Sequence, residues 1–400
     1  MLSASLLLTR AAAFAIAVTS CTAAVFSSTD GFTSSSYSSS YGGNAICISG
    51  KTYINASATN TKINYSIPDQ LNATQTIQEL LSPYTNIYTA TNGGPANVSG
   101  SYALAARLCF PADETAAAKV NTVHLLTHGA TLDSTYWDFA KGYSYIDAAA
   151  AAGYATFSYD RLGVGSSVHP DPIQVVQGAL QVEILHQLVL RLRGLASSGL
   201  GGKTFSKVVG IGHSAGATFT QAVTARYPAD FDAVALSGIT TSTGTVAAAE
   251  AAFALVVANS QSRFRGIANG YFTFGSGQPG IQFAYFKYPY FDASILAKQT
   301  STIQTNTLGE LLTFGSIVAP AAAYTNPVYI LNGANDYVFC GGNCSQPVDQ
   351  NAAALAFFYP AVGAKGKSGQ EPNAGHNLFL HTGATGFYAN VINWVNENEL

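Results

Sequence analysis

From residue 122 onward the chain alternates short apolar stretches with longer stretches typical of helices. The apolar stretches, each typical of a buried strand, lie at 122–128, 154–160, 207–212, 232–238 and 327–333. Helical segments lie at 143–153, 172–196, 215–226 and 384–397. Because parallel strands need crossover connections, which helices usually supply, this alternation predicts an α/β fold with a mostly parallel sheet covered by helices on both faces.

The stretch 207–212 leads into Gly212-His213-Ser214-Ala215-Gly216, which has the pattern G-x-S-x-G and is followed by a predicted helix. The pattern is short enough to arise by chance, so its position between a strand and a helix carries the argument. On such a turn the serine backbone is strained and its Oγ projects above the sheet, where the helix N-terminus favours a developing anion. We therefore predict that Ser214 is a nucleophile; an ordinary loop serine is the alternative.

A serine hydroxyl is a poor nucleophile at neutral pH and needs a base that is oriented by an acid. In folds with this turn, the acid and then the histidine follow the serine along the chain. Two histidines follow Ser214. His376 stands on a predicted loop before the last helix and is the predicted base, whereas His381 is more typical of a surface or supporting residue.

The predicted acid is Asp336. It directly follows the strand at 327–333, at the carboxyl end where ligands bind in open α/β sheets. Asp349 and Glu371 also lie downstream of the serine, but neither ends a clear strand. Because a lone aspartate after a strand is often a turn former, its place in the Ser, Asp, His order is what favours a catalytic role.

An oxyanion hole needs two backbone N–H groups that converge on the carbonyl oxygen of a substrate. The predicted donors are Ala215, directly after the nucleophile, and Ala130, in the loop after the strand at 122–128. His128 is expected to hold that loop rather than to act as a second base. Asp160 and Arg161 are expected to form a structural pair beside a glycine-rich turn, which is not a dinucleotide fingerprint.

The N-terminus has the layout of a secretory signal peptide. Arg10 precedes the apolar run 11–18, and small residues follow up to Ala24, which predicts a signal peptide over 1–24. The run is too short for a transmembrane helix, so no stable membrane span is predicted. A lipoprotein signal acylated at Cys21 is the alternative. The Ser-rich segment 25–44 is expected to be a flexible leader.

Sequons and cysteines also indicate a secreted, extracellular protein. Five N-x-S/T sequons stand at Asn55, Asn64, Asn72, Asn97 and Asn343, which are predicted glycosylation sites. Cys47, Cys109, Cys340 and Cys344 remain after removal of the signal peptide. Four cysteines in a secreted chain suggest disulfides with three connectivities, of which Cys47–Cys109 with Cys340–Cys344 is favoured because the second pair can close a small loop.

Composition limits the partners. Apolar residues make up 48% of the 400 residues and charged residues 10%, with a net charge of −3 and no basic run, which argues against nucleic acid. No zinc-ligand pattern occurs, and we predict neither a metal nor a cofactor.

The regular alternation breaks at 240–325, which predicts a cap insertion between core segments 45–239 and 326–400. Ten aromatic residues lie from Phe264 to Phe291, and we expect most to form the insertion's own core and a few to line the active site.

Taken together, these motifs resemble the α/β-hydrolase superfamily. The match consists of "HGA" after a strand, "DRLGVGSS" after the next, the elbow "GHSAG", then "GAND" and "AGHN", over roughly residues 100–400. More narrowly, "TYWD", "YSYIDAAAAAGYATFSYDRLG" and the flanking cysteines resemble the secreted fungal α/β-hydrolases, which are lipase- or esterase-like with a serine nucleophile. The resemblance implies the fold, a Ser-His-Asp triad and no cofactor, but it implies no substrate.

The sequence therefore predicts a secreted serine hydrolase that cleaves a carboxylic ester through an acyl-enzyme. Low charge and an aromatic-rich cap suggest a small, uncharged ester. An acyltransferase with the same triad is one alternative, and a catalytically silent binding protein on the same fold is another. The sequence leaves the oligomeric state open.

Overall fold

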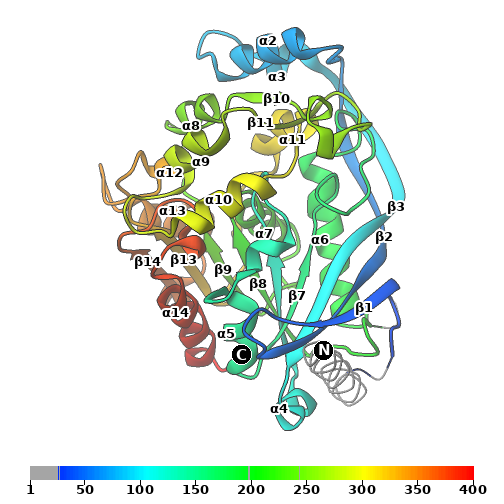
Figure 1. The fold of residues 1–400 in the computed structure, drawn as a ribbon, viewed down its shortest axis with the longest axis vertical. Helices are drawn as coiled ribbons and strands as arrows, with labels where there is room; N and C mark the ends of the chain where they lie inside the picture. Colours follow the sequence, from blue (N-terminus) through cyan, green and yellow to red (C-terminus); the bar gives the residue numbers. More distant parts are fainter. Residues whose placement is uncertain (1–25, 27, 197–198, 243) are drawn as a thin grey trace, which may run out of the picture.

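The computed structural model describes residues 26, 28–196, 199–242 and 244–400. Its centre is a nine-stranded sheet in the order β1-β2-β3-β7-β4-β8-β9-β13-β14 (Figure 1). The strands β1 to β3 and the β3–β7 pair are antiparallel, and the remaining pairs, from β7 to β14, are parallel. The bounds are β1 Thr33–Ser39, β2 Ala45–Ile63, β3 Asn92–Pro111, β4 Thr122–Thr127, β7 Ala155–Tyr159, β8 Lys207–His213, β9 Ala233–Ser237, β13 Val328–Gly333 and β14 Gly366–Glu371. The predicted α/β fold with a mostly parallel sheet is confirmed.

Helices cover both faces of the sheet. Successive strand residues point to opposite sides, so neighbouring residues of one strand pack against different helices. Val208 packs in a cluster with α6 and α7, whereas its neighbour Val209 packs in another with α5 and α14. Both valines are fully buried. The helices around the sheet are α4 Glu114–Lys119, α5 Tyr145–Ala151, α6 Gly178–Leu192, α7 Ala215–Arg226, α12 Tyr337–Cys340, α13 Gln350–Phe358 and α14 Ala384–Glu397. A small hairpin, β5 Asp138–Ala140 and β6 Tyr143–Ser144, precedes α5.

The Ser-rich segment departs from the expected flexible leader. Residues 33–39 form the edge strand β1, which pairs antiparallel with β2 and aligns Tyr37 with Ile48 and Ser38 with Cys47. Six of its seven residues are exposed. A polar composition suits such an edge strand, because the backbone makes the ladder hydrogen bonds while the side chains face water.

The strands β2 and β3 form a long hairpin that extends well beyond the rest of the sheet, along the right of Figure 1. Alternating apolar residues around 46–54, 62–67 and 102–110 predict shorter strands in this part of the sequence. Residues 64–91 at the tip instead carry α2 Gln70–Leu81 and α3 Ile87–Thr91. This arm packs on the insertion, since Gln70 Oε1 accepts from Val257 N at 2.8 Å and Asn269 Nδ2 donates to Pro68 O at 2.8 Å.

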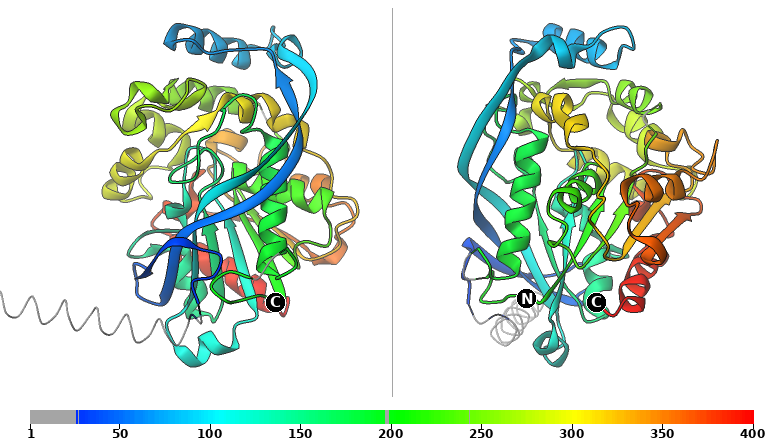
Figure 2. Two further views of the ribbon diagram at one scale, coloured as in Figure 1. Left: turned by 90° about the vertical axis from the view of Figure 1, so that its right-hand side faces the viewer. Right: turned by 180° about the vertical axis from the view of Figure 1, so that it is seen from behind.

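The segment between β9 and β13 forms a cap of its own above the carboxyl ends of the parallel strands (Figure 2). It holds a three-stranded sheet in the order β10-β11-β12. The elements are β10 Leu255–Val257, β11 Tyr271–Phe274, β12 Asn306–Thr307, α8 Val246–Phe253, α9 Gly277–Tyr285, α10 Ala293–Thr302 and α11 Leu308–Thr313, with short 3₁₀ turns at Ala258–Ser260, Ser262–Phe264 and Phe314–Ile317.

Both favoured disulfides are present. Cys47–Cys109 joins directly paired residues of β2 and β3, and Cys340–Cys344 closes a short loop at the end of α12. All five sequon asparagines, Asn55, Asn64, Asn72, Asn97 and Asn343, are exposed. The predicted signal peptide 1–24, including Cys21, lies outside the described residues. Among the helices described, none has the length and apolar character needed to cross a membrane.

Candidate active site

Ser214 stands on a sharp turn between β8 and α7. Its φ is +55°, a strained value for a residue other than glycine, and its N–H donates to Ser237 O at 2.8 Å. Gly216 allows the turn to pack tightly, because a Cβ at that position would lie 2.0 Å from Thr127 O on β4. The strand–turn–helix geometry thus places the serine at the carboxyl edge of the sheet and at the N-terminus of α7.

The structure brings the three predicted triad residues together. His376 Nε2 lies 2.9 Å from Ser214 Oγ, and His376 Nδ1 lies 2.8 Å from Asp336 Oδ2. Asp336 is 0% exposed and His376 2% exposed, whereas Ser214 is partly exposed. A serine hydroxyl, an imidazole and a carboxylate in this order form the constellation that activates a nucleophilic serine.

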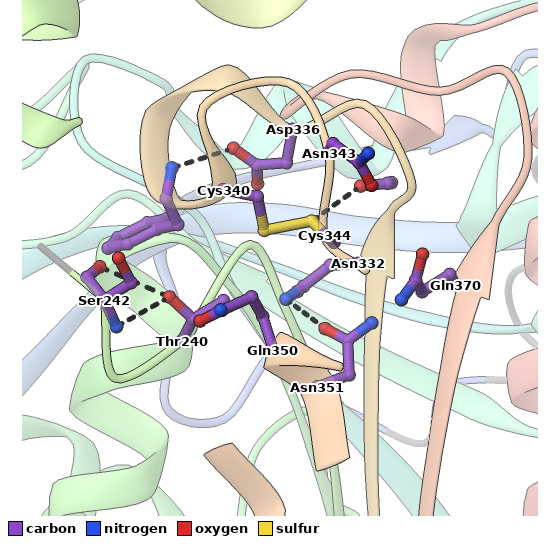
Figure 3. The surroundings of a disulfide bond; sticks show 12 residues. Thr240, Ser242, Asn332, Asp336, Cys340, Asn343, Cys344, Gln350, Asn351 and Gln370 are labelled. Carbon is purple, nitrogen blue, oxygen red and sulfur yellow. Dashed lines mark hydrogen bonds between the residues drawn. A yellow bond between two sulfur atoms is a disulfide. The ribbon is translucent and has the colours of Figure 1, made fainter. Parts of the chain in front are cut away.

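Asp336 is oriented by its own backbone surroundings. It caps α12, and its Oδ1 accepts from Phe339 N at 3.1 Å, which leaves Oδ2 for the histidine. The Cys340–Cys344 disulfide closes the loop that follows (Figure 3). Cys344 N also donates to Ala334 O at 3.0 Å. The disulfide therefore ties the segment that carries the acid to the end of β13.

The competing candidates lie elsewhere. Asp349 caps α13, with its Oδ1 accepting from Asn351 N at 2.9 Å. Glu371 ends a strand that the sequence did not reveal, β14, and bonds Asn390. The expectation that Glu371 ends no strand is wrong, because β14 is a polar edge strand whose parallel pairing with β13 leaves no apolar pattern.

His381 is a buried supporting residue, and the alternative that it lies on the surface is wrong, since its exposure is 0%. Its Nε2 accepts two backbone hydrogen bonds, from Gly375 N at 3.0 Å and Lys287 N at 3.0 Å. Its Nδ1 donates to Asn377 O at 3.0 Å. His381 thus joins the loop of the catalytic histidine candidate to the cap.

The loop after β4 lies directly against the serine. A Cβ added at Gly129 would stand 3.0 Å from Ser214 Cβ, which places Ala130 next to the nucleophile candidate. His128 holds this loop as expected: its Nδ1 lies 2.9 Å from Gly129 O, and its Nε2 accepts from Arg161 N at 2.9 Å. Ala215, the other predicted donor, is the first residue of α7, where helix N–H groups have no partner within the helix.

Arg161 does not pair with Asp160. Its guanidinium forms a buried ion pair with Glu310 of α11, with both side chains at most 2% exposed. Asp160 instead accepts from Ser134 N at 3.0 Å and from Ser166 N at 2.8 Å. The cap therefore contributes the counter-ion to the arginine that holds the loop of His128.

His213, inside the elbow, is a further supporting residue that sequence reasoning left without a role. Its Nδ1 lies 3.1 Å from Ser237 Oγ and its Nε2 3.1 Å from Asn377 Oδ1. Burial, together with the neighbouring His376, holds the pKa of His213 well below its usual value, so the ring is neutral. The elbow and the residue after His376 are thus joined by a neutral hydrogen-bonded link.

The cap covers the site with an aromatic side chain. The Tyr285 ring stacks on His376 with 5.5 Å between centroids, and its hydroxyl lies 3.1 Å from Thr131 Oγ1. Phe339 flanks the same imidazole at 5.7 Å. Tyr285 belongs to the aromatic run of the insertion, whereas Phe272 and Phe274 of that run are buried in its small sheet. In the described part of the chain, no group of three His, Cys, Asp or Glu could hold a metal ion.

Comparison with known proteins agrees with this architecture. Residues 125–386 match the alpha/beta hydrolase family, and the chain belongs to that family. A thermophilic esterase from Thermogutta terrifontis, solved with malate, is 17% identical with a TM-score of 0.51, over 75% of this chain and 96% of that one. A 2-hydroxy-6-oxo-6-phenylhexa-2,4-dienoate hydrolase from Rhodococcus sp. strain RHA1 is 16% identical with a TM-score of 0.49, over the same shares.

At 17% identity the likeness to the esterase structure shows the fold alone. No protein with a curated description matches the sequence. The narrower resemblance to secreted fungal members of the family stays a prediction.

Proposed function

We propose that this α/β hydrolase is a serine esterase, a hydrolase that cleaves a carboxylic ester through an acyl-enzyme. The observation that carries the proposal is the hydrogen-bonded series Ser214 Oγ, His376 and Asp336, with distances of 2.9 and 2.8 Å, on a strained elbow. Membership of the hydrolase family supports it.

In the proposed mechanism, Ser214 Oγ attacks the acyl carbon while His376 Nε2 takes the hydroxyl proton. Asp336 holds the imidazole in the correct orientation and stabilises its charged form. The N–H groups of Ala130 and Ala215 bind the oxyanion, and each such donor typically contributes about 2.7–4 kcal/mol. His376 then protonates the leaving alcohol and activates the water that releases the acid.

The surroundings support an uncharged acyl group. Tyr285 and Phe339 flank the imidazole, and the neighbouring His213 is neutral.

We also propose that the protein is secreted and glycosylated. The exposure of all five sequon asparagines and the two disulfides support this proposal.

Labelling with a fluorophosphonate probe, followed by peptide mapping, tests the proposal. The expected result is one covalent adduct on Ser214, none in Ser214→Ala, and unchanged labelling in Ser101→Ala, a control at an exposed serine outside the sequons. Turnover of uncharged esters should also be lost in Ser214→Ala. Absence of an adduct on intact folded protein would refute the activated serine, and transfer to an added alcohol in preference to water would show an acyltransferase instead.

A further inference from the structure

A wide groove lies where the β1–β2 edge of the sheet faces the cap. Its volume is about 1370 Å³, and its walls come from β1, two loops at 133–138 and 160–169, and two cap segments at 263–267 and 298–304. The described residues that line it do not include the triad candidates. Sites for one small molecule typically measure about 300–1,000 Å³, so this groove suits an extended ligand.

Positive charge gathers along the groove. Five of the chain's 18 lysines and arginines line it: Lys51, Arg107, Arg263, Arg265 and Lys298. Arg107 is paired with Asp138, and Lys298 donates to a backbone carbonyl. Within the described residues, the Lys51 ammonium and the Arg265 guanidinium have neither a hydrogen bond nor an ion pair. Two cationic side chains thus remain free to bind a ligand.

The acidic residues of the groove are already bonded within the protein. Asp160 accepts backbone hydrogen bonds from Ser134 and Ser166. Asp133 accepts from Thr135 N at 2.9 Å and from Gln304 Nε2 at 2.8 Å. Burial, and then the nearby Asp160, raise the pKa of Asp133 to about 6. The groove therefore offers cations but no free carboxylate, which favours an anionic ligand.

The remaining lining is rich in hydroxyl groups and exposed aromatic rings. Eight serines line the groove, and Tyr37 and Tyr41 are 37% and 56% exposed. Phe264 adds another ring, covered by the Arg263 guanidinium at 4.4 Å. Sugar rings pack their C–H faces on aromatic rings, and their hydroxyls bond to serine and tyrosine hydroxyls. We propose that the groove binds an oligosaccharide that carries carboxylate groups.

The groove is linked to the catalytic loop through one residue. Gln304 Nε2 bonds Asp133 in the groove wall, while Gln304 N donates at 2.8 Å to Thr131 O, next to the predicted oxyanion donor Ala130. Binding of the oligosaccharide does not depend on the proposed esterase activity. In a further step, which does rest on that activity, the groove holds the sugar part of an ester whose acyl group reaches Ser214.

Titration calorimetry with a linear hexamer of galacturonic acid tests the site on the full chain. The hexamer contains no ester, so binding is measured without turnover. Its matched partner is the neutral hexamer in which each carboxylate is reduced to an alcohol. Lys51→Ala/Arg265→Ala removes the two free cations, and Lys365→Ala/Lys367→Ala removes the same charge from a segment outside the groove.

The acidic hexamer is expected to bind, to bind more weakly as salt is raised, and to lose at least tenfold in affinity in the groove variant only. Equal binding of the neutral hexamer would overturn the charge argument. No binding at millimolar concentration, or equal losses in both double variants, would overturn the site. Fluorophosphonate labelling of Ser214 in each variant is a separate readout, so failure of the groove and failure of the esterase are distinguished.

Discussion

Replacement of His381 by glutamine tests how the cap is attached to the catalytic loop. The imidazole Nε2 accepts one N–H from the loop, at Gly375, and one from the cap, at Lys287. Protonation would turn Nε2 from an acceptor into a donor that faces two N–H groups, and both hydrogen bonds would be lost. Burial, the main cause, lowers the pKa of His381 from 6.5 to about 4.

The sign and size of the pH effect follow from this lowered pKa. Between pH 6.5 and 4 the unfolded chain holds the proton at His381 while the folded protein does not, so stability falls as the pH falls. A fall from 6.5 to about 4 corresponds to about 3 kcal/mol. Asp133 and Glu250, whose pKa values burial raises to about 6 and about 7, act in the opposite direction. The difference between wild type and variant therefore isolates His381.

Urea unfolding, followed by fluorescence of the buried Trp137 and Trp394, measures the effect at constant ionic strength. At pH 7 the wild type should exceed His381→Gln in unfolding free energy, because hydrogen bonds are lost. This excess should shrink by about 3 kcal/mol between pH 7 and 4. His381→Asn, which also cannot titrate, should show the same shift. Parallel pH curves, within 1 kcal/mol, would refute the reasoning.

Two further substitutions test the loop after β4. Glu310→Ala leaves Arg161 buried without its ion partner and should lower the unfolding free energy by about 3–5 kcal/mol; a loss under 1 kcal/mol in urea unfolding would contradict the structure. Gly129→Ala places a methyl group 3.0 Å from Ser214 Cβ and should slow fluorophosphonate labelling at least tenfold. Gly386→Ala, at an open helical position, is the control and should be labelled at the wild-type rate. Equal rates for both variants would show that the loop moves to accommodate the methyl group.

Local sequence patterns predicted those parts of the fold that are determined by residues close together in the sequence. The helix expected at 215–226 coincides with α7, and the one at 384–397 coincides with α14. Both have clear sequence limits, and α14 also has an apolar face. In contrast, β1 and β14 are edge strands with polar side chains, and only their neighbours in the sheet make them strands. The same holds for the arm at 64–91, whose place depends on packing against the cap.

The candidate site shows the same division. Ser214, Asp336 and His376 were predictable because each follows a strand or precedes a helix in a fixed order along the chain. The contacts of His381 and His213 were not, because their partners are backbone and side-chain groups from distant segments. A buried neutral histidine leaves no spacing rule in a sequence, and its role becomes visible only when both ring nitrogens have named partners.

These distant contacts make part of the cap a fixed wall of the site. Asn377 N donates to Tyr285 O at 3.0 Å, and Thr382 N donates to Tyr290 O at 2.9 Å, on either side of the His381 contact with Lys287. The segment 285–290 is therefore joined to the loop of His376 by four hydrogen bonds, the fourth from Thr382 Oγ1 to Tyr290 O at 3.3 Å. Because Tyr285 also stacks on the imidazole, any opening that separates this segment from the loop would disturb the base. Substrate binding is therefore expected to leave this segment in place.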